Sequence, residues 1–342
     1  MSLFGQLIAR RSLMQAAGLG ALAGTVGSPA RAQTEMTRLG EGPIWSREYT
    51  AKKGDTPLHL FRKRVGAPGP NSAPLPVLFL VHGSSNSSRS TFDLAVPGRT
   101  DYSLMDKFAQ YGFDVWTMDH DGYGRSGSSG NNSDIASGVE DLKVGTELVA
   151  RESGRGKLHF CGTSSGAIRA AAFAAAQPDR VDRLVLVAFT YKGTGSPTLA
   201  NRAKRIEEYR ANTRRLRDRE MIRSIFTRDK PGTTDMVVAD ALADEELKFG
   251  NQVPTGTYLD MVANLPLVDP KQVKAPTMLL RGEFDGIASM QDLTDFYLQL
   301  PNGDKQFVVL PGIAHSVVYA NNRHLFWHAL REFITMPAPV GT

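Results

Sequence analysis

A serine between two glycines stands where the sequence predicts an abrupt turn from a strand into a helix. The segment 162–166 reads G-T-S-S-G; an apolar run, 157–161, precedes it, and a stretch of small residues, 167–176, follows. A tight turn of this kind projects the serine hydroxyl clear of the backbone, and the glycines let strand and helix pass without Cβ clashes. The pattern is short and also arises by chance, but its setting favours Ser164 as a nucleophile.

A serine hydroxyl is a weak nucleophile, so it needs a general base and a carboxylate that orients this base. Of the seven histidines, His315 lies in the loop just beyond the last apolar run, 306–310, where an imidazole can reach a serine. His120, in a glycine-rich loop, is the competing candidate. Asp285 follows the preceding apolar run and is the preferred carboxylate, with Glu283 as the second candidate. Asp285 could instead only close an Asx-type turn.

Acyl transfer also needs two N–H donors for the oxyanion of the tetrahedral intermediate. We expect one at Ser165, the residue after the candidate nucleophile, where the predicted helix begins. We expect the other at Ser84, with Ser85 as the alternate, in the loop that follows the apolar run 77–81. His82 in this loop is expected to be structural, because the glycine after it permits close backbone approach.

The elements that must position these residues are alternating strands and helices. Continuous apolar runs, which fit strands buried on both faces of a parallel sheet, occupy 77–81, 113–118, 157–161, 181–188, 277–281 and 306–310. Helical patterns separate several of them, and the stretches 44–52 and 58–64 read as an antiparallel hairpin. Right-handed crossovers place the loops after parallel strands at one sheet edge, so the candidate residues are expected to meet there.

Five motifs in this order resemble the α/β-hydrolase fold superfamily over about residues 43–337. They are His82-Gly83, Asp119-x-x-Gly122-x-Gly124-x-Ser126, Gly162 to Gly166, Gly282-Glu283-x-Asp285 and Gly312-x-x-His315. The chain order Ser, Asp, His is that of the family. The resemblance implies an α/β fold with a doubly wound, mostly parallel sheet and a helical cap insertion, and acyl transfer without a cofactor or metal ion.

Two positions refine this resemblance. Asp121 is a departure, since many relatives in the epoxide-hydrolase-like branch carry an arginine there, and this change concerns a local salt bridge rather than the triad. Haloalkane dehalogenases and epoxide hydrolases of this fold use an aspartate at the turn, so Ser164 disfavours both activities.

The connection between the runs 181–188 and 277–281 is far longer than an ordinary one. We expect residues 190–269 to form a helical cap, on a core made of 33–189 and 270–342. Within it, 201–230 is helical in composition and carries eleven Lys and Arg against five Asp and Glu, an excess of six positive charges.

That basic run could attract an acidic substrate or an anionic surface. We expect instead a solvated face with ion pairs between neighbouring turns. It lacks the aromatic interleaving of single-strand nucleic-acid binders, so we expect no nucleic-acid partner. The more apolar residues that follow it, between 249 and 265, are expected to roof the pocket.

The N-terminal 32 residues resemble a Tat-type export signal. Arg10-Arg11 precede a weakly apolar stretch, and Ala30-Arg31-Ala32 resembles a cleavage site. Glycines interrupt the apolar stretch, so no stable membrane insertion is expected. The alternatives are a disordered tail or an amphipathic transit peptide. We therefore expect a periplasmic or secreted protein, and its one cysteine, Cys161, allows no internal disulfide and is expected to be a buried packing residue.

Together these features predict a serine hydrolase that cleaves a small-molecule carboxylic ester through a Ser-His-Asp triad and an acyl-enzyme. The same residues could hydrolyse an amide, a lactone or a carbon–carbon bond, or act as a cofactor-free perhydrolase or haloperoxidase. A non-catalytic binding member of the fold is the alternative from another class. Nothing in the sequence specifies the oligomeric state.

Overall fold

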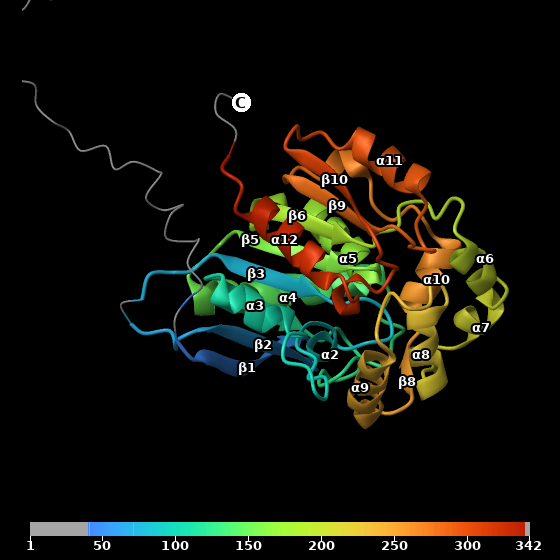
Figure 1. Cartoon of the computed structure of the whole chain (residues 1–342), viewed down its shortest axis with the longest axis horizontal. Helices are drawn as coiled ribbons and strands as arrows, with labels where there is room; N and C mark the ends of the chain where they lie inside the picture. Colours follow the sequence, from blue (N-terminus) through green and yellow to red (C-terminus); the bar gives the residue numbers. More distant parts are fainter. Residues whose placement is uncertain (1–39, 41, 71, 339–342) are drawn as a thin grey trace, which may run out of the picture. The chain divides into compact units, whose positions relative to one another are not determined.

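An eight-stranded sheet organises the structure, a computed structural model that describes residue 40 and residues 42–70 and 72–338. Its strand order is β1-β2-β4-β3-β5-β6-β9-β10 (Figure 1). β1 pairs antiparallel with β2 and β2 with β4, whereas all other neighbours are parallel. The expectation of a mostly parallel α/β sheet with an N-terminal hairpin is thus confirmed. The predicted export signal, 1–32, lies outside the described residues.

The strands begin and end within two residues of the apolar runs and alternating stretches that predicted them. They are β1 (Ile44–Lys53), β2 (Thr56–Val65), β3 (Val77–Val81), β4 (Asp114–Met118), β5 (Leu158–Thr163), β6 (Val181–Val187), β9 (Thr277–Gly282) and β10 (Lys305–Leu310). Every residue of β3, β4, β5 and β9 is buried. Because helices cover both faces of these strands, their sequences are mostly apolar instead of alternating.

Helices pack on both faces of the sheet, and alternate side chains of a strand face them. In β3, Phe79 joins the apolar core on one face, whereas Leu78 and Leu80 join the core on the other. The helices α4 (Ile135–Ser153), α5 (Ser165–Ala176) and α11 (Met290–Gln299) contribute side chains to the first core. The short helix η1 (Pro178–Arg180) follows α5 in the chain, and η3 (Pro270–Gln272) precedes β9. The second receives α2 (Ser88–Phe92), α3 (Leu104–Gln110), η4 (Val317–Tyr319) and α12 (Arg323–Ile334).

The chain between β6 and β9, residues 188–276, is called the cap segment below. It contains α6 (Pro197–Ala203), α7 (Ile206–Ala211), β7 (Arg214–Leu216), α8 (Arg219–Thr227), α9 (Met236–Glu246), η2 (Leu247–Phe249), β8 (Gln252–Pro254) and α10 (Gly256–Ala263). Its helices gather beyond one end of the sheet (Figure 1). The limits 190 and 269, predicted for a cap, stay a prediction.

The expectation of helix throughout 201–230 is wrong at Arg214–Leu216. These residues form β7, which pairs antiparallel with β8. Helical composition is a weak prior, and here pairing with a segment about 40 residues away overrides it. The backbone N–H of Arg217 extends the pairing by donating to the Asn251 carbonyl at 2.7 Å.

A buried carboxylate fastens the cap segment to the core. Glu246, at the end of α9, accepts hydrogen bonds from the Ser87 N–H at 2.6 Å, the Ser87 hydroxyl at 2.8 Å and the Ser90 hydroxyl. It also pairs with Arg217, whose guanidinium donates to the Ser85 carbonyl at 2.8 Å. Burial raises the pKa of Glu246, although the charge of Arg217 and these donors oppose the rise.

Within the described residues, no helix has the length and apolar character that crossing a membrane requires.

Candidate active site

Ser164 occupies a strained turn between β5 and α5. Its backbone φ of 55° and ψ of −125° are unusual for a residue with a side chain. A Cβ on Gly162 would overlap the Gly166 carbonyl, and a Cβ on Gly166 would overlap the Val81 carbonyl. The two glycines therefore let α5 start directly against β3 and β5, and the turn leaves the Ser164 side chain at the end of the sheet.

Three side chains from three separate loops form one hydrogen-bonded chain. His315 Nε2 lies 2.9 Å from Ser164 Oγ, and His315 Nδ1 lies 2.9 Å from Asp285 Oδ1. Ser164 follows β5, Asp285 follows β9 and His315 follows β10, so these parallel strands deliver all three to the same edge. This is the geometry of a nucleophile, a base and a carboxylate that orients the base.

Of the two carboxylates after β9, Asp285 is the one that reaches the imidazole. Glu283 instead accepts a hydrogen bond from the Gly312 N–H at 2.8 Å. The Arg281 guanidinium holds this loop by donating to the carbonyls of Glu283, at 2.9 Å, and Asp285, at 2.8 Å. The structure therefore separates the two candidates that the sequence left open.

Asp285 is held as a carboxylate although it is buried. Burial by itself would raise its pKa, but the His315 charge, the His315 hydrogen bond and the Ile287 N–H at 2.8 Å lower the pKa below its ordinary value. A charged carboxylate at this distance fixes the Nδ1–H tautomer of His315, which leaves Nε2 free to accept the proton of Ser164.

The two residues that carry the candidate oxyanion donors are in contact through their side chains. The Ser84 hydroxyl is 2.8 Å from the Ser165 hydroxyl and 2.7 Å from the Thr257 hydroxyl of the cap segment. A Cβ on Gly83 would lie 2.8 Å from the Thr163 carbonyl oxygen, so the loop after β3 runs in contact with the turn. The alternate, Ser85, has a φ of 79°.

The remaining candidate histidines are structural. His82 is buried, donates from Nδ1 to the Gly83 carbonyl at 2.8 Å and accepts at Nε2 from the His120 N–H at 3.0 Å. His120 is also buried and contacts Asp141 at 3.0 Å. Burial lowers the pKa of His82 to about 3 and that of His120 to about 4, so both are neutral at pH 7. The structure thus does not bring the competing base, His120, to Ser164.

Asp121, the departure from the family pattern, has a local partner. Its carboxylate pairs with Lys53 at 3.2 Å, and Lys53 also pairs with Asp141 at 2.5 Å.

Cys161 is fully buried in β5, and burial raises the pKa of its thiol. Among the residues that the structure describes, no three His, Cys, Asp or Glu side chains gather where they could hold a metal ion.

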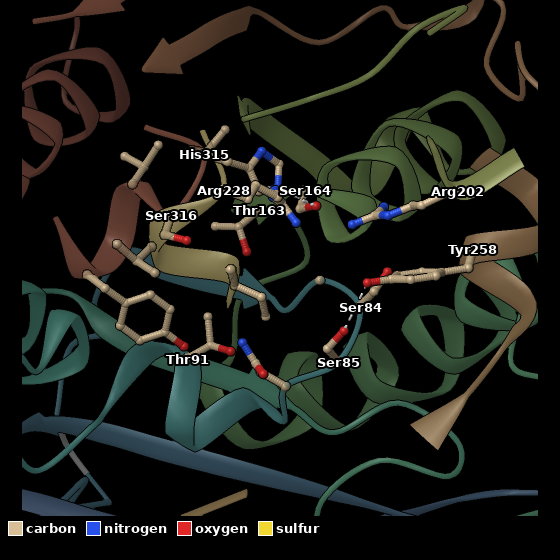
Figure 2. A pocket seen from close by; sticks show the side chains of 17 residues that line it. Ser84, Ser85, Thr91, Thr163, Ser164, Arg202, Arg228, Tyr258, His315 and Ser316 are labelled. Carbon is tan, nitrogen blue, oxygen red and sulfur yellow. Dashed lines mark hydrogen bonds between the residues drawn. The ribbon is translucent and has the colours of Figure 1, made fainter. Parts of the chain in front are cut away.

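A cavity opens beside Ser164 and His315. It has a volume of about 70 Å³ and is lined by the loop after β3, by η4 and by the cap segment. Figure 2 shows Arg202 and Tyr258 together at one side of it. Among the apolar residues expected between 249 and 265, Tyr258 lines this cavity. Arg202 and Arg228 also line it.

The sequence analysis did not predict that Arg202 and Arg228 line the cavity beside Ser164. The excess of positive charge in 201–230 was the feature that could have indicated it. The expectation of a solvated face is wrong for part of that run. Arg215, in β7, is 5% exposed, and Arg217, directly after β7, is 1% exposed, because both guanidinium groups donate to Ser85 in the loop after β3. Elsewhere in the run the expected surface pairs occur, for example Arg210 with Glu207 at 2.6 Å.

Comparison with known proteins supports the fold and gives the family. Residues 73–321 match the family model described as Serine aminopeptidase, S33 (Hydrolase_4). The chain belongs to this family of α/β-hydrolases. This hydrolase is 25% identical to the 2-hydroxy-6-oxononadienedioate/2-hydroxy-6-oxononatrienedioate hydrolase of Burkholderia vietnamiensis, over 66% of this chain and 77% of that protein.

Solved structures share the fold of this hydrolase. A thermophilic esterase from Thermogutta terrifontis is 21% identical with a TM-score of 0.57, covering 85% of this chain and 98% of that one. The 2-hydroxy-6-oxo-6-phenylhexa-2,4-dienoate hydrolase from Rhodococcus sp. strain RHA1 is 17% identical with a TM-score of 0.60, covering 85% and 99%. At these identities the likeness concerns the fold.

Proposed function

We propose that this hydrolase cleaves carboxylic esters of small molecules through a serine acyl-enzyme. The observation that carries the proposal is the chain of hydrogen bonds from Asp285 through His315 to Ser164, with 2.9 Å at each step, at the wall of a cavity. A nucleophile, its base and the orienting carboxylate in hydrogen-bond contact are the arrangement that activates a hydroxyl.

The mechanism follows from these positions. Ser164 Oγ attacks the acyl carbonyl carbon while His315 Nε2 takes the hydroxyl proton. The N–H groups of Ser84 and Ser165 hold the oxyanion that forms on the carbonyl oxygen. His315 then protonates the leaving alkoxide, which departs as the alcohol. A water molecule repeats these steps on the acyl-enzyme, releasing the acid and restoring Ser164.

The proposal is tested by replacing the nucleophile and by labelling it. Ser164→Ala should lower kcat on p-nitrophenyl acetate by about 10⁴- to 10⁶-fold with an unchanged melting temperature. A fluorophosphonate probe should label the wild type and the control Ser129→Ala, whose serine is exposed, but not Ser164→Ala. Full activity or full labelling of Ser164→Ala would exclude this mechanism, and an unlabelled, folded wild type would favour a non-catalytic binding protein.

Hydrolysis of a carbon–carbon bond is the second candidate. The relative from Burkholderia vietnamiensis, 25% identical, carries the name of a 2-hydroxy-6-oxononadienedioate hydrolase, which supports it. The same triad could also act on amides or lactones, or as a perhydrolase. A panel of p-nitrophenyl esters, lactones, amino-acyl anilides and a 2-hydroxy-6-oxo-dienoate separates these, since kcat/KM should be highest for the true class of bond.

We also propose that residues 1–32 direct Tat export and that residues 190–269 act as a cap that controls access to Ser164. The twin Arg10-Arg11 and the Ala30-Arg31-Ala32 triplet support export to the periplasm or beyond. A double Arg10→Lys, Arg11→Lys variant should then remain unprocessed inside the cell. Processing and export equal to the wild type would contradict the signal.

A further inference from the structure

The cap segment supplies a cationic wall to the cavity that holds Ser164. Arg202, on α6, and Arg228, directly after α8, line this cavity together with Ser164 and His315. A second cavity of about 230 Å³ lies against the same wall and is lined by Arg202, Arg228 and two further arginines. Within the part of the chain that the structure describes, no Asp or Glu lines either cavity.

The charge of this wall is only partly neutralised by the protein. Arg217, two residues after Arg215 in the chain, pairs with Glu246. Arg228 Nε lies 3.2 Å from an oxygen of Asp229. Neither Arg202 nor Arg215 has a carboxylate within 4 Å among the described residues. Arg215 donates to the Ser85 hydroxyl at 2.6 Å, but its buried Nε has no hydrogen-bond partner there. Unpaired buried charge is costly, so the site favours an anion.

The arginines of this wall lower the pKa of the Tyr258 phenol. The guanidinium carbons of Arg202 and Arg215 lie 4.0 and 3.7 Å from the centre of its ring. Burial would raise the pKa of the phenol, but Arg202, Arg215, a Ser85 hydrogen bond and Arg228 lower it to about 7. Tyr209, whose ring centre is 5.7 Å away, is the other titratable group packed against it. The phenol is thus stabilised as an anion by the same charges.

We propose that Arg202 and Arg228, with Arg215 behind Tyr258, form a subsite for a carboxylate group of the substrate. The inference rests on the proposed function and deepens it, because it names the substrate class as anionic esters. A planar guanidinium donates two parallel hydrogen bonds to a carboxylate, and the shared cavity puts this contact beside the scissile carbonyl. The same wall repels a substrate that carries an ammonium group at this place.

Paired substrates test the subsite. The p-nitrophenyl ester of succinic acid carries one carboxylate, and its methyl ester is nearly the same size without the charge. The wild type should prefer the anionic ester by kcat/KM, and Arg202→Gln should reduce this preference about 10- to 100-fold, mainly through KM. Arg210→Gln is the matched control, since Arg210 is an exposed arginine of the cap segment that pairs with Glu207.

A second measurement does not depend on turnover. In Ser164→Ala protein, tyrosinate absorbance near 295 nm should report the ionisation of Tyr258, with Tyr258→Phe as the reference. Added succinate should move this ionisation to higher pH, since it neutralises the arginines. The shift should be lost in Arg202→Gln. Inorganic phosphate that acts as strongly as succinate would overturn the carboxylate assignment.

The outcomes separate the subsite from the proposed function. A wild type that hydrolyses both esters without preferring the anion overturns the subsite and leaves the esterase intact. A preference that survives in Arg202→Gln and in Arg228→Gln also overturns it. If neither ester is hydrolysed, the ester proposal fails, and the succinate titration still decides whether the carboxylate binds.

Discussion

The most direct test of the catalytic geometry is Asp285→Asn. The Ile287 N–H, at 2.8 Å, and His315 Nδ1, at 2.9 Å, both contact the same carboxylate oxygen, Oδ1. An asparagine of the same size can therefore keep both hydrogen bonds with its amide oxygen, and the Nδ1–H tautomer of His315 with them. What the substitution removes is the negative charge that stabilises the His315 imidazolium when Nε2 takes the proton of Ser164 Oγ.

The size of the effect follows from the distance between carboxylate and imidazole. When His315 becomes an imidazolium during the reaction, its Nδ1 lies 2.9 Å from Asp285 Oδ1. With an effective dielectric constant of about 20, two unit charges at this separation attract by about 6 kcal/mol. A loss of this size in the transition state corresponds to a decrease in kcat of about 10⁴-fold.

The assay is the hydrolysis of p-nitrophenyl acetate by wild type, Asp285→Asn and Glu283→Gln, with thermal melting as the folding control. Glu283→Gln is matched, because Glu283 stands two residues away and bonds to the Gly312 N–H instead of His315. Its kcat should stay within about threefold of the wild type, as for a surface side chain. If Asp285→Asn keeps kcat within tenfold of the wild type, or if Glu283→Gln shows the large loss, the assignment is refuted.

Three further changes test the loop, the cap and the buried histidine. Gly83→Ala puts a Cβ 3.1 Å from the Cβ of Ser164, so it should displace the Ser84 N–H and lower kcat about 10²- to 10³-fold. Glu246→Ala leaves Arg217 buried without its partner, which should cost about 3–5 kcal/mol in urea unfolding. His120 has a folded pKa of about 4, below the ordinary 6.5. The folded state therefore binds fewer protons, and about 3 kcal/mol of stability should disappear as the pH falls from 6.5 to 4.

Each of these has a clear contrary result. Wild-type kcat in Gly83→Ala would mean that the loop after β3 takes no part in the reaction. Glu245, an exposed neighbour that pairs with Lys248, provides the control. If Glu246→Ala lowers the free energy of unfolding no more than Glu245→Ala does, the buried pair of Glu246 and Arg217 does not stabilise the fold. An equally steep loss of stability with pH in His120→Gln and the wild type would show that another group titrates.

Much of the fold could be predicted because the signal is local. A strand buried on both faces is mostly apolar, so the runs 77–81 and 277–281 identify β3 and β9 almost to the residue. Gly154, with a φ of 71°, is the left-handed residue at which α4 ends. The helices and strands of the cap segment were harder to predict. β7, for example, forms by pairing with β8, a strand about 40 residues later in the chain.

The residues of the candidate site could also be proposed from the sequence, because each follows a predicted strand. Ser164 comes directly after β5, whereas Asp285 and His315 lie in the loops that follow β9 and β10, and parallel strands bring such positions to one edge. The choice between Asp285 and Glu283 was not accessible. It depends on which carboxylate the turn after β9 aims at the imidazole, and Arg281 fixes that turn through backbone carbonyls.

By itself, the sequence determined the class of fold, the strand–turn–helix at Ser164 and the chain order of Ser164, Asp285 and His315, since strand periodicity and glycine spacing act over a few residues. Only the tertiary structure decided which arginines of the basic run 201–230 face inward. Arg202 lines the cavity beside Ser164, while Arg210 pairs with Glu207 at the surface. Composition gives the same charge to both, and the packing of α6 and β7 against Tyr258 and the core loop determines where that charge acts.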